Sequence, residues 1–281
     1  MTVHRVQVQG GTLAVEELSG TSEPVLVVHG VSSQRALWTR LHAGAPDLTL
    51  VAPDLRGRGD SVDVAGPSSM AQHAQDLVAV LDHLGLDRVH VYGMSMGGFV
   101  SVELAARYPD RVRSLTLVDG GVPAVPPNGL TRETVSAVFA DKVERSRQTR
   151  ASVDEYVDFV VSSSAPLLDR SDPLLHIYAA HDLHEGVVRL DGNTVVSDAE
   201  DVFFGISNFA DVRAPISLLY AQWSVGADSA PMYTAEYLSQ YTFEPSTRLD
   251  GHDHAAMIMT GSGAAATAKV LRAAISQPSS R

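Results

Sequence analysis

The sequence predicts a doubly wound α/β protein with a mostly parallel sheet and an inserted helical segment. Apolar runs typical of buried strands alternate with amphipathic helical stretches from residue 24 to 118, and the alternation resumes at residue 216. Between these two parts, residues 122–212 contain no convincing buried strand. A third observation is a Gly-x-Ser-x-Gly segment, Gly93–Gly97, that stands between a predicted strand and a predicted helix.

The chain opens as a predicted β-hairpin and continues as alternating strands and helices. Strands are predicted at Val3–Val8, Thr12–Leu18, Pro24–Val28, Leu48–Ala52, 88–92, Val112–Val118, Ile216–Tyr220 and Thr242–Leu249. Helices are predicted at Gln34–Ala43, Met70–Leu84, Phe99–Tyr108, Met232–Gln240 and Ala264–Ile275. In the insertion, helices are predicted near Thr131–Arg150, Val153–Ser163, Pro173–His184 and Ala199–Phe209. This pattern divides the chain into a core of residues 1–121 and 213–281 and a helical cap of residues 122–212.

Composition and charge narrow the class of protein. Hydrophobic residues make up 44% of the 281 residues and charged residues 19%, which is typical of a globular protein. A net charge of −12 argues against nucleic acid or an anionic membrane surface as a partner. There is no cysteine, no apolar stretch typical of a signal peptide, and no apolar run near the ~20 residues of a membrane span. We expect a cytoplasmic protein with a small-molecule substrate, and the oligomeric state stays open.

The Gly93–Gly97 segment is the strongest functional signal. A tight turn between a strand and a helix lifts the central hydroxyl out of the sheet and aims the first backbone amides of the helix at its target. Such a turn needs small residues two positions either side of the serine, and glycine stands at both. Ser95 is therefore the predicted nucleophile.

Four motifs together resemble those of the α/β-hydrolase family with a helical cap, over nearly the whole chain. The first is the Gly93–Gly97 segment. The other three are His29-Gly30-Val31-Ser32, Asp54-Leu55-Arg56-Gly57-Arg58-Gly59-Asp60-Ser61 and Asp250-Gly251-His252-Asp253-His254. The resemblance implies an eight-stranded sheet, a Ser-His-acid triad and no metal or cofactor. Asp54, Arg56 and Ser61 are expected to brace loops around the site.

The resemblance also suggests roles for individual residues. His254 falls where the family has its catalytic base, with His252 as the alternative two residues away. The backbone N–H groups of Met96 and Val31 are expected to form the oxyanion hole. His29 is expected to orient the backbone of its turn rather than to transfer protons.

The third member of the triad departs from the family pattern. Counting along the strand that begins at Ile216, the usual aspartate position holds Ser224. Asp119, at the end of the strand next to the nucleophile strand, is the preferred replacement, and Asp228 is the alternative. Either would accept the Nδ1–H of the histidine and stabilise the imidazolium.

Other residues are compatible with a pocket or, more weakly, with a metal. Trp38 and Trp223, with aromatic residues of the cap, predict an apolar substrate pocket. His176, His181 and His184 invite a metal interpretation, His181 and His184 lying three residues apart on a predicted helix, but solvated cap histidines are the preferred interpretation.

These features predict a serine hydrolase that cleaves a carboxylic ester or lactone of a small to medium, largely apolar substrate through an acyl-enzyme. The same residues also serve C–C bond hydrolases and cofactor-free haloperoxidases, and some relatives are small-molecule receptors. Those alternatives stay open at this stage.

Overall fold

A computed structural model describes residues 2–124, 126 and 129–277, without the side chains of residues 141–142 and 145–146. Its centre is an eight-stranded sheet of order β1-β2-β4-β3-β5-β6-β9-β10, which confirms the predicted doubly wound fold. The six strands from β4 to β10 in this order are parallel, and β1 and β2 pair antiparallel at one edge. The strands are β1 (Thr2–Val8), β2 (Gly11–Leu18), β3 (Pro24–Val28), β4 (Thr49–Pro53), β5 (Val89–Met94), β6 (Val112–Val118), β9 (Ile216–Trp223) and β10 (Ser246–Asp253).

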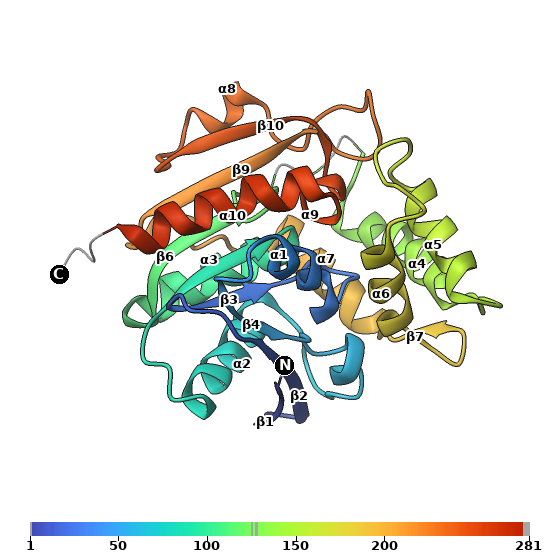
Figure 1. Cartoon of the computed structure of the whole chain (residues 1–281), viewed down its shortest axis with the longest axis horizontal. Helices are drawn as coiled ribbons and strands as arrows, with labels where there is room; N and C mark the ends of the chain where they lie inside the picture. The colour runs from blue at the N-terminus through green and yellow to red at the C-terminus, as the bar shows by residue number, and fades with distance from the viewer. Residues whose placement is uncertain (1, 125, 127–128, 278–281) are drawn as a thin grey trace.

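Helices cover both faces of the sheet (Figure 1). α2 and α3 pack together on one face, and α1, α9 and α10 pack together on the other. Each face has its own apolar cluster, as expected for central strands such as β3 and β5 that are buried on both sides. These helices and the short α8 are α1 (Thr39–Gly44), α2 (Met70–His83), α3 (Met96–Arg107), α8 (Ala235–Leu238), α9 (Ala256–Met259) and α10 (Gly261–Ser276).

The insertion between β6 and β9 is mainly helical and gathers at one end of the sheet (Figure 1). Its elements are α4 (Arg132–Arg147), α5 (Val153–Ser162), α6 (Pro173–Asp182), the strands β7 (Leu183–His184) and β8 (Val187–Val188), and α7 (Gly192–Phe204). It has its own apolar cluster, which includes Tyr156 and Val157 of α5. The insertion also touches the core through an isolated antiparallel bridge between Arg58 and Leu190.

Several predicted boundaries in the C-terminal half are wrong, and the helix predicted at Met232–Gln240 is only the short α8. α7 begins at Gly192 rather than Ala199, because the Asp191 side chain caps its first turn by accepting from the Thr194 N–H. β10 begins at Ser246 rather than Thr242, since Pro245 has no N–H to donate to a ladder. α6 ends at Asp182, so His184 lies in a strand and not on one helix face with His181. Among the described residues, no helix is long and apolar enough to cross a membrane.

Candidate active site

Ser95 lies at the carboxyl end of β5, in the sharp turn that leads into α3. Its backbone has φ 56° and ψ −127°, a region that L-residues seldom adopt. The neighbouring glycines make this turn possible. A methyl group on Gly97 would lie 2.0 Å from the Val28 carbonyl oxygen, and one on Gly93 would lie 2.3 Å from the Gly97 carbonyl oxygen. Met96 is the first residue of α3, where backbone N–H groups have no acceptor within the helix.

The loop after β3 lies beside the serine. A methyl group on Gly30 would lie 3.1 Å from Ser95 Cβ and 3.5 Å from its Oγ, so the loop backbone passes close to the serine side chain. His29 is fully buried and holds this loop: its Nδ1 donates to the Gly30 carbonyl at 2.8 Å and its Nε2 accepts from the Leu55 N–H at 3.0 Å. Burial lowers the pKa of His29 to about 3, so the ring is neutral and can make both bonds. The carbonyl that His29 holds belongs to the same peptide group as the Val31 N–H.

His254 and Asp119 are brought together by the fold, although 135 residues separate them. His254 Nδ1 lies 2.6 Å from Asp119 Oδ2, and the other carboxylate oxygen of Asp119 accepts from the Ala221 N–H at 3.1 Å. Asp119 is fully buried, whereas a quarter of the His254 side chain is exposed. Asp119 directly follows β6, the neighbour of the β5 strand that ends at Ser95, so both residues lie at the same edge of the sheet. Its φ of 44° turns the chain away from β6.

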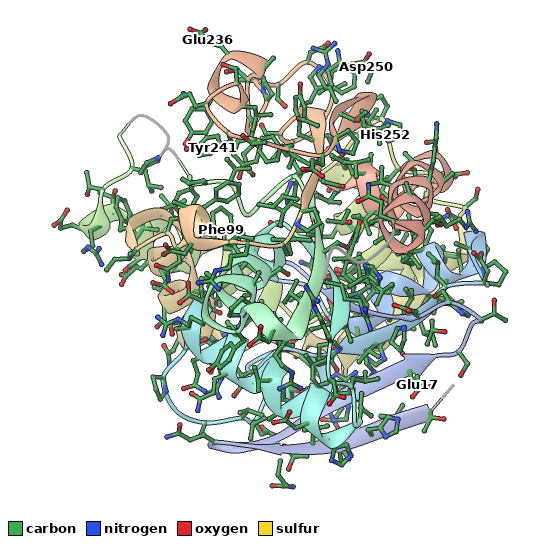
Figure 2. The ribbon with its side chains drawn as sticks, turned by 90° about the vertical axis from the view of Figure 1, so that its left-hand side faces the viewer. Glu17, Phe99, Glu236, Tyr241, Asp250 and His252 are labelled. Carbon is green, nitrogen blue, oxygen red and sulfur yellow. The ribbon has the colours of Figure 1, made fainter. Side chains whose placement is uncertain are left out.

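The alternative residues lie elsewhere. Asp228 is exposed and makes no side-chain hydrogen bond among the described residues. His252 bonds to the Asp250 carbonyl and to the Ser262 hydroxyl near the surface (Figure 2). Ser224, at the position where the family has its acid, accepts from the His254 N–H through its carbonyl at 3.4 Å. The geometry therefore favours His254 over His252 and Asp119 over Asp228.

Asp253, which the sequence suggests is a loop residue, lies at the end of β10 and has a long-range role beside this site. Its carboxylate is buried and accepts from the Ala256 N–H at 2.8 Å, the Gly226 N–H at 2.7 Å and the Ser164 hydroxyl. It thereby joins the end of β10 to the start of α9, to the loop after β9 and to the insertion. Its place inside an aspartate- and histidine-rich segment gave no indication of this long-range role.

The two predicted pocket tryptophans have different surroundings. Trp38 is fully buried in the core cluster next to α10, with its ring edge-on to Tyr92 at 5.1 Å between centroids. The expectation that Trp38 lines a substrate pocket is therefore wrong, since its side chain has no exposed surface. Trp223 is partly buried at the carboxyl end of β9, where it pairs with Asp253 of β10. Its assignment to the pocket stays a prediction.

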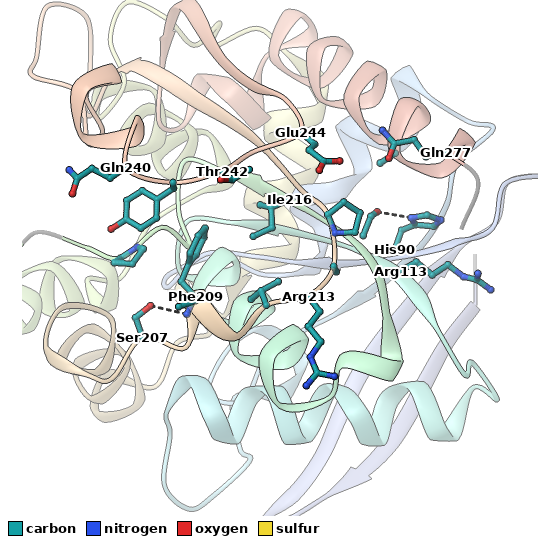
Figure 3. Close-up of a pocket in the computed structure, with 18 residues that line it drawn as sticks. His90, Arg113, Ser207, Phe209, Arg213, Ile216, Gln240, Thr242, Glu244 and Gln277 are labelled. Carbon is teal, nitrogen blue, oxygen red and sulfur yellow. Dashed lines mark hydrogen bonds between the residues drawn. The ribbon is translucent and has the colours of Figure 1, made fainter. Parts of the chain in front are cut away.

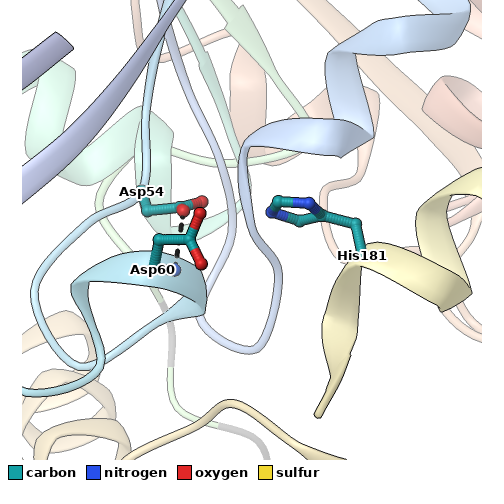
Figure 4. Close-up of side chains that lie close together, drawn as sticks. All are labelled: Asp54, Asp60 and His181. Atoms are coloured by element: carbon teal, nitrogen blue, oxygen red, sulfur yellow. Dashed lines mark hydrogen bonds between the residues drawn. The ribbon is translucent and has the colours of Figure 1, made fainter. Parts of the chain in front are cut away.

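Asp54, Asp60 and His181 lie close enough together to be considered as metal ligands (Figure 4). Arg35, however, pairs with both carboxylates, reaching Asp60 Oδ2 at 2.6 Å, and Arg189 pairs with the other oxygen of Asp60. Burial raises the pKa of Asp54 against the opposing effect of Arg35. The cluster is thus a network of arginine–carboxylate pairs that ties the loop after β4 to the insertion.

The other residues singled out in the sequence also have structural partners. The Arg56 guanidinium forms a buried two-point pair with Asp76 at 2.8 and 2.9 Å. Ser61 accepts from the Ala14 N–H at 2.9 Å, so both residues brace loops as expected. His176 lies 3.1 Å from Asp154 Oδ1 on the surface of the insertion.

A cavity of about 1060 Å³ lies at the opposite edge of the sheet, around the amino ends of β6 and β9 (Figure 3). Ser114, Ile216 and Phe209 are among its lining residues. None of the predicted site residues lines it, so it is separate from the site at Ser95.

The sequence profile of the alpha/beta hydrolase fold family matches residues 23–169, just over half of the chain. The protein belongs to this family, as its motifs predicted. Lipase LipV of Mycobacterium tuberculosis is 41% identical over 124 residues, which are 43% of this chain and 46% of the lipase. The chain thus spans less than half the length of such relatives.

Solved structures match over the whole length at low identity. The crystal structure of E-2-(acetamidomethylene)succinate hydrolase has a TM-score of 0.79 and 21% identity, covering 98% of this chain and 99% of that one. The N-acyl homoserine lactonase AidH has a TM-score of 0.70 and 23% identity, covering 99% and 98%. These likenesses extend the shared fold to the insertion and the C-terminal strands.

Proposed function

We propose that this protein is a serine hydrolase that cleaves a carboxylic ester or lactone through an acyl-enzyme. The observation that carries the proposal is the 2.6 Å contact between His254 Nδ1 and Asp119 Oδ2, at the sheet edge where Ser95 occupies its strained turn. An imidazole whose Nδ1–H is held by a buried carboxylate presents Nε2 as a base, which is what a serine hydroxyl needs to become nucleophilic.

In the proposed reaction, Ser95 Oγ attacks the carbonyl carbon while His254 Nε2 accepts the hydroxyl proton. The N–H groups of Met96 and Val31 hold the oxyanion of the tetrahedral intermediate. The intermediate collapses by breaking the ester C–O bond, and the leaving alkoxide takes the proton from His254. Water then attacks the acyl-enzyme with His254 again as base, releasing the acid and restoring the Ser95 hydroxyl. In a lactone the alcohol and the acid remain one molecule.

Among the described residues, no hydrogen bond joins the Ser95 hydroxyl to His254. Catalytic hydrogen bonds are often long without substrate and shorten in the complex, so this agrees with the proposed roles. The relatives named a lipase and a lactonase support hydrolysis of an ester or lactone.

The apolar character of the proposed substrate agrees with the side chains around the site. Val31 packs against the apolar cluster of the insertion, which includes Val160 and Val161 of α5 at its margin. The same two valines also contact a small cluster that contains Ala255, the neighbour of His254. Apolar side chains of the insertion thus extend from the predicted oxyanion residue to the histidine.

The test is the rate of product release from a panel of aryl esters and lactones by the wild type, Ser95→Ala, His254→Gln and His252→Gln. His252→Gln is the matched control, because it changes the same residue type two positions away, where the ring bonds to Ser262 instead of Asp119. We expect the first two variants to lose turnover by about 10³-fold or more and the control to stay within threefold of the wild type. Undiminished turnover by Ser95→Ala would overturn the proposal. If the wild type hydrolyses no ester or lactone of the panel, the proposed reaction is wrong. C–C bond cleavage, haloperoxidase chemistry or a receptor role would then be the function to test.

A further inference from the structure

Arg58 is a buried cation that touches both residues of the predicted oxyanion hole. It belongs to the loop after β4 and has no exposed surface. Its Nε donates to the Val31 carbonyl at 2.9 Å, and its Nη2 lies 3.8 Å from Met96 Sδ. Val31 lies in the loop after β3 and Met96 begins α3, more than sixty residues later, so one guanidinium links the two halves of the hole.

Arg58 is itself held by the insertion. Its Nη1 lies 2.6 Å from Asp198 Oδ2 of α7. Asp198 also accepts from the Ser68 hydroxyl at 2.6 Å and lies 3.0 Å from His73 Nε2 of α2. Although burial opposes it, the nearby His73 and Arg58 keep the pKa of Asp198 well below its usual range. The guanidinium is therefore paired with a buried anion and has little freedom to move.

This arrangement matters because an oxyanion hole works by preorganisation. Its donors stabilise the developing charge only if they already point at it, and losing one donor typically costs 10²–10³-fold in kcat. His29 bonds to the Gly30 carbonyl, which lies in the peptide group before Val31. Arg58 bonds to the Val31 carbonyl, which lies in the peptide group after it. Residue 31 is thus fixed at both of its peptide groups.

We propose that Arg58 is a positioning residue that fixes the oxyanion hole, and that Asp198 fixes Arg58 from the insertion. The kinetic part of this inference rests on the proposed function. Arg58 does not touch substrate in this role; it acts through the backbone of Val31 and the side chain of Met96.

Arg56 supplies a matched control for the kinetic test. It lies two residues away, is equally buried and forms a comparable pair with Asp76, but its remaining bonds go to carbonyls of Gln9, Ala65 and Pro67. Lysine at either position keeps the charge but loses the planar fork. We expect Arg58→Lys to lower kcat at least 30-fold with KM within threefold, and Arg56→Lys to leave kcat within threefold. An equal loss of kcat in both variants, or a change confined to KM, would overturn the proposal.

A second measurement does not depend on turnover. Amide hydrogen exchange at Ser33 reports how firmly the turn around Val31 is held, because the Ser33 N–H donates to the Gly30 carbonyl at 3.3 Å. We expect Arg58→Lys to accelerate this exchange at least tenfold beyond any change in the global unfolding free energy, and Arg56→Lys to leave it unaltered by the same comparison. Unchanged exchange at Ser33 in folded Arg58→Lys refutes the positioning role. This readout decides the matter even if the wild type hydrolyses no ester, an outcome that would defeat the proposed function alone.

Discussion

A buried carboxyl group in the insertion makes the stability of the protein depend on pH. Asp182 is 2% exposed at the end of α6, and its Oδ2 accepts from the Tyr156 hydroxyl at 2.6 Å. Burial raises the pKa of Asp182 from 3.8 to about 7, with a further contribution from Asp54, so the folded chain keeps a proton there that the unfolded chain releases near pH 4. Between these two pKa values the folded state binds more protons than the unfolded state. The free energy of unfolding therefore falls as the pH rises from about 4 through 7.

The size of the effect follows from the shift. About three pKa units at about 1.4 kcal/mol each set a ceiling of about 4 kcal/mol, of which about 3 kcal/mol is lost between pH 5 and 8. Asp182→Asn keeps an oxygen acceptor for Tyr156 but cannot ionise. We expect the unfolding free energy of the variant, relative to the wild type, to rise by about 3 kcal/mol over that range.

Urea unfolding followed by circular dichroism at pH 5, 6, 7 and 8 measures this difference, and subtracting one protein from the other cancels every other titrating group. Tyr156→Phe is the companion variant. It removes the hydrogen bond that opposes the rise in pKa, so it should extend the pH dependence upward. A difference between wild type and Asp182→Asn that does not vary with pH would refute the reasoning.

Two further predictions concern the site. Asp119→Asn should lower kcat about 10³–10⁴-fold, because it removes the acceptor for His254 Nδ1–H. Asp228→Asn should stay near the wild-type rate. Steady-state kinetics that show the opposite pattern would reverse the choice of acid. Gly97→Ala should cost at least about 3 kcal/mol in unfolding free energy, because its methyl would lie 2.0 Å from the Val28 carbonyl oxygen. Gly44→Ala, with nothing within 4 Å, should be neutral or slightly stabilising, and equal urea midpoints for the two variants would contradict the steric argument.

The fold was predictable because its central strands carry strong local signals. β3 and β6 have the predicted bounds. β3 is a continuous apolar run, which is typical of a strand buried on both faces, and β6 is rich in leucine and β-branched residues. The position of Ser95 also followed from local sequence, because the turn demands glycine at fixed offsets. The parallel, doubly wound character of the sheet followed from the alternation of strands and helices, and the break in that alternation predicted the insertion.

Features that depend on distant contacts were not predictable in the same way. Local sequence offered both Asp119 and Asp228, and only the fold shows which carboxylate reaches His254. Trp38 is an apolar side chain near a functional loop, and nothing in its neighbourhood indicates that it faces Tyr92 rather than a pocket. Arg58 and Arg56 belong to the same motif, yet Arg58 bonds to the Val31 carbonyl whereas Arg56 pairs with Asp76.

The bridge between Arg58 and Leu190 also bears on how this protein could be recombined with its relatives. The Gly59 N–H donates to the Arg189 carbonyl at 3.0 Å, and the Asp191 N–H donates to the Gly57 carbonyl at 2.8 Å. A chimaera that exchanged the whole insertion would lose both of these backbone bonds. It would also lose the carboxylate of Asp198 and leave the guanidinium of Arg58 buried without its anion. The insertion and the loop after β4 are therefore structurally coupled. A chimaera that receives this insertion should also receive residues 57–59.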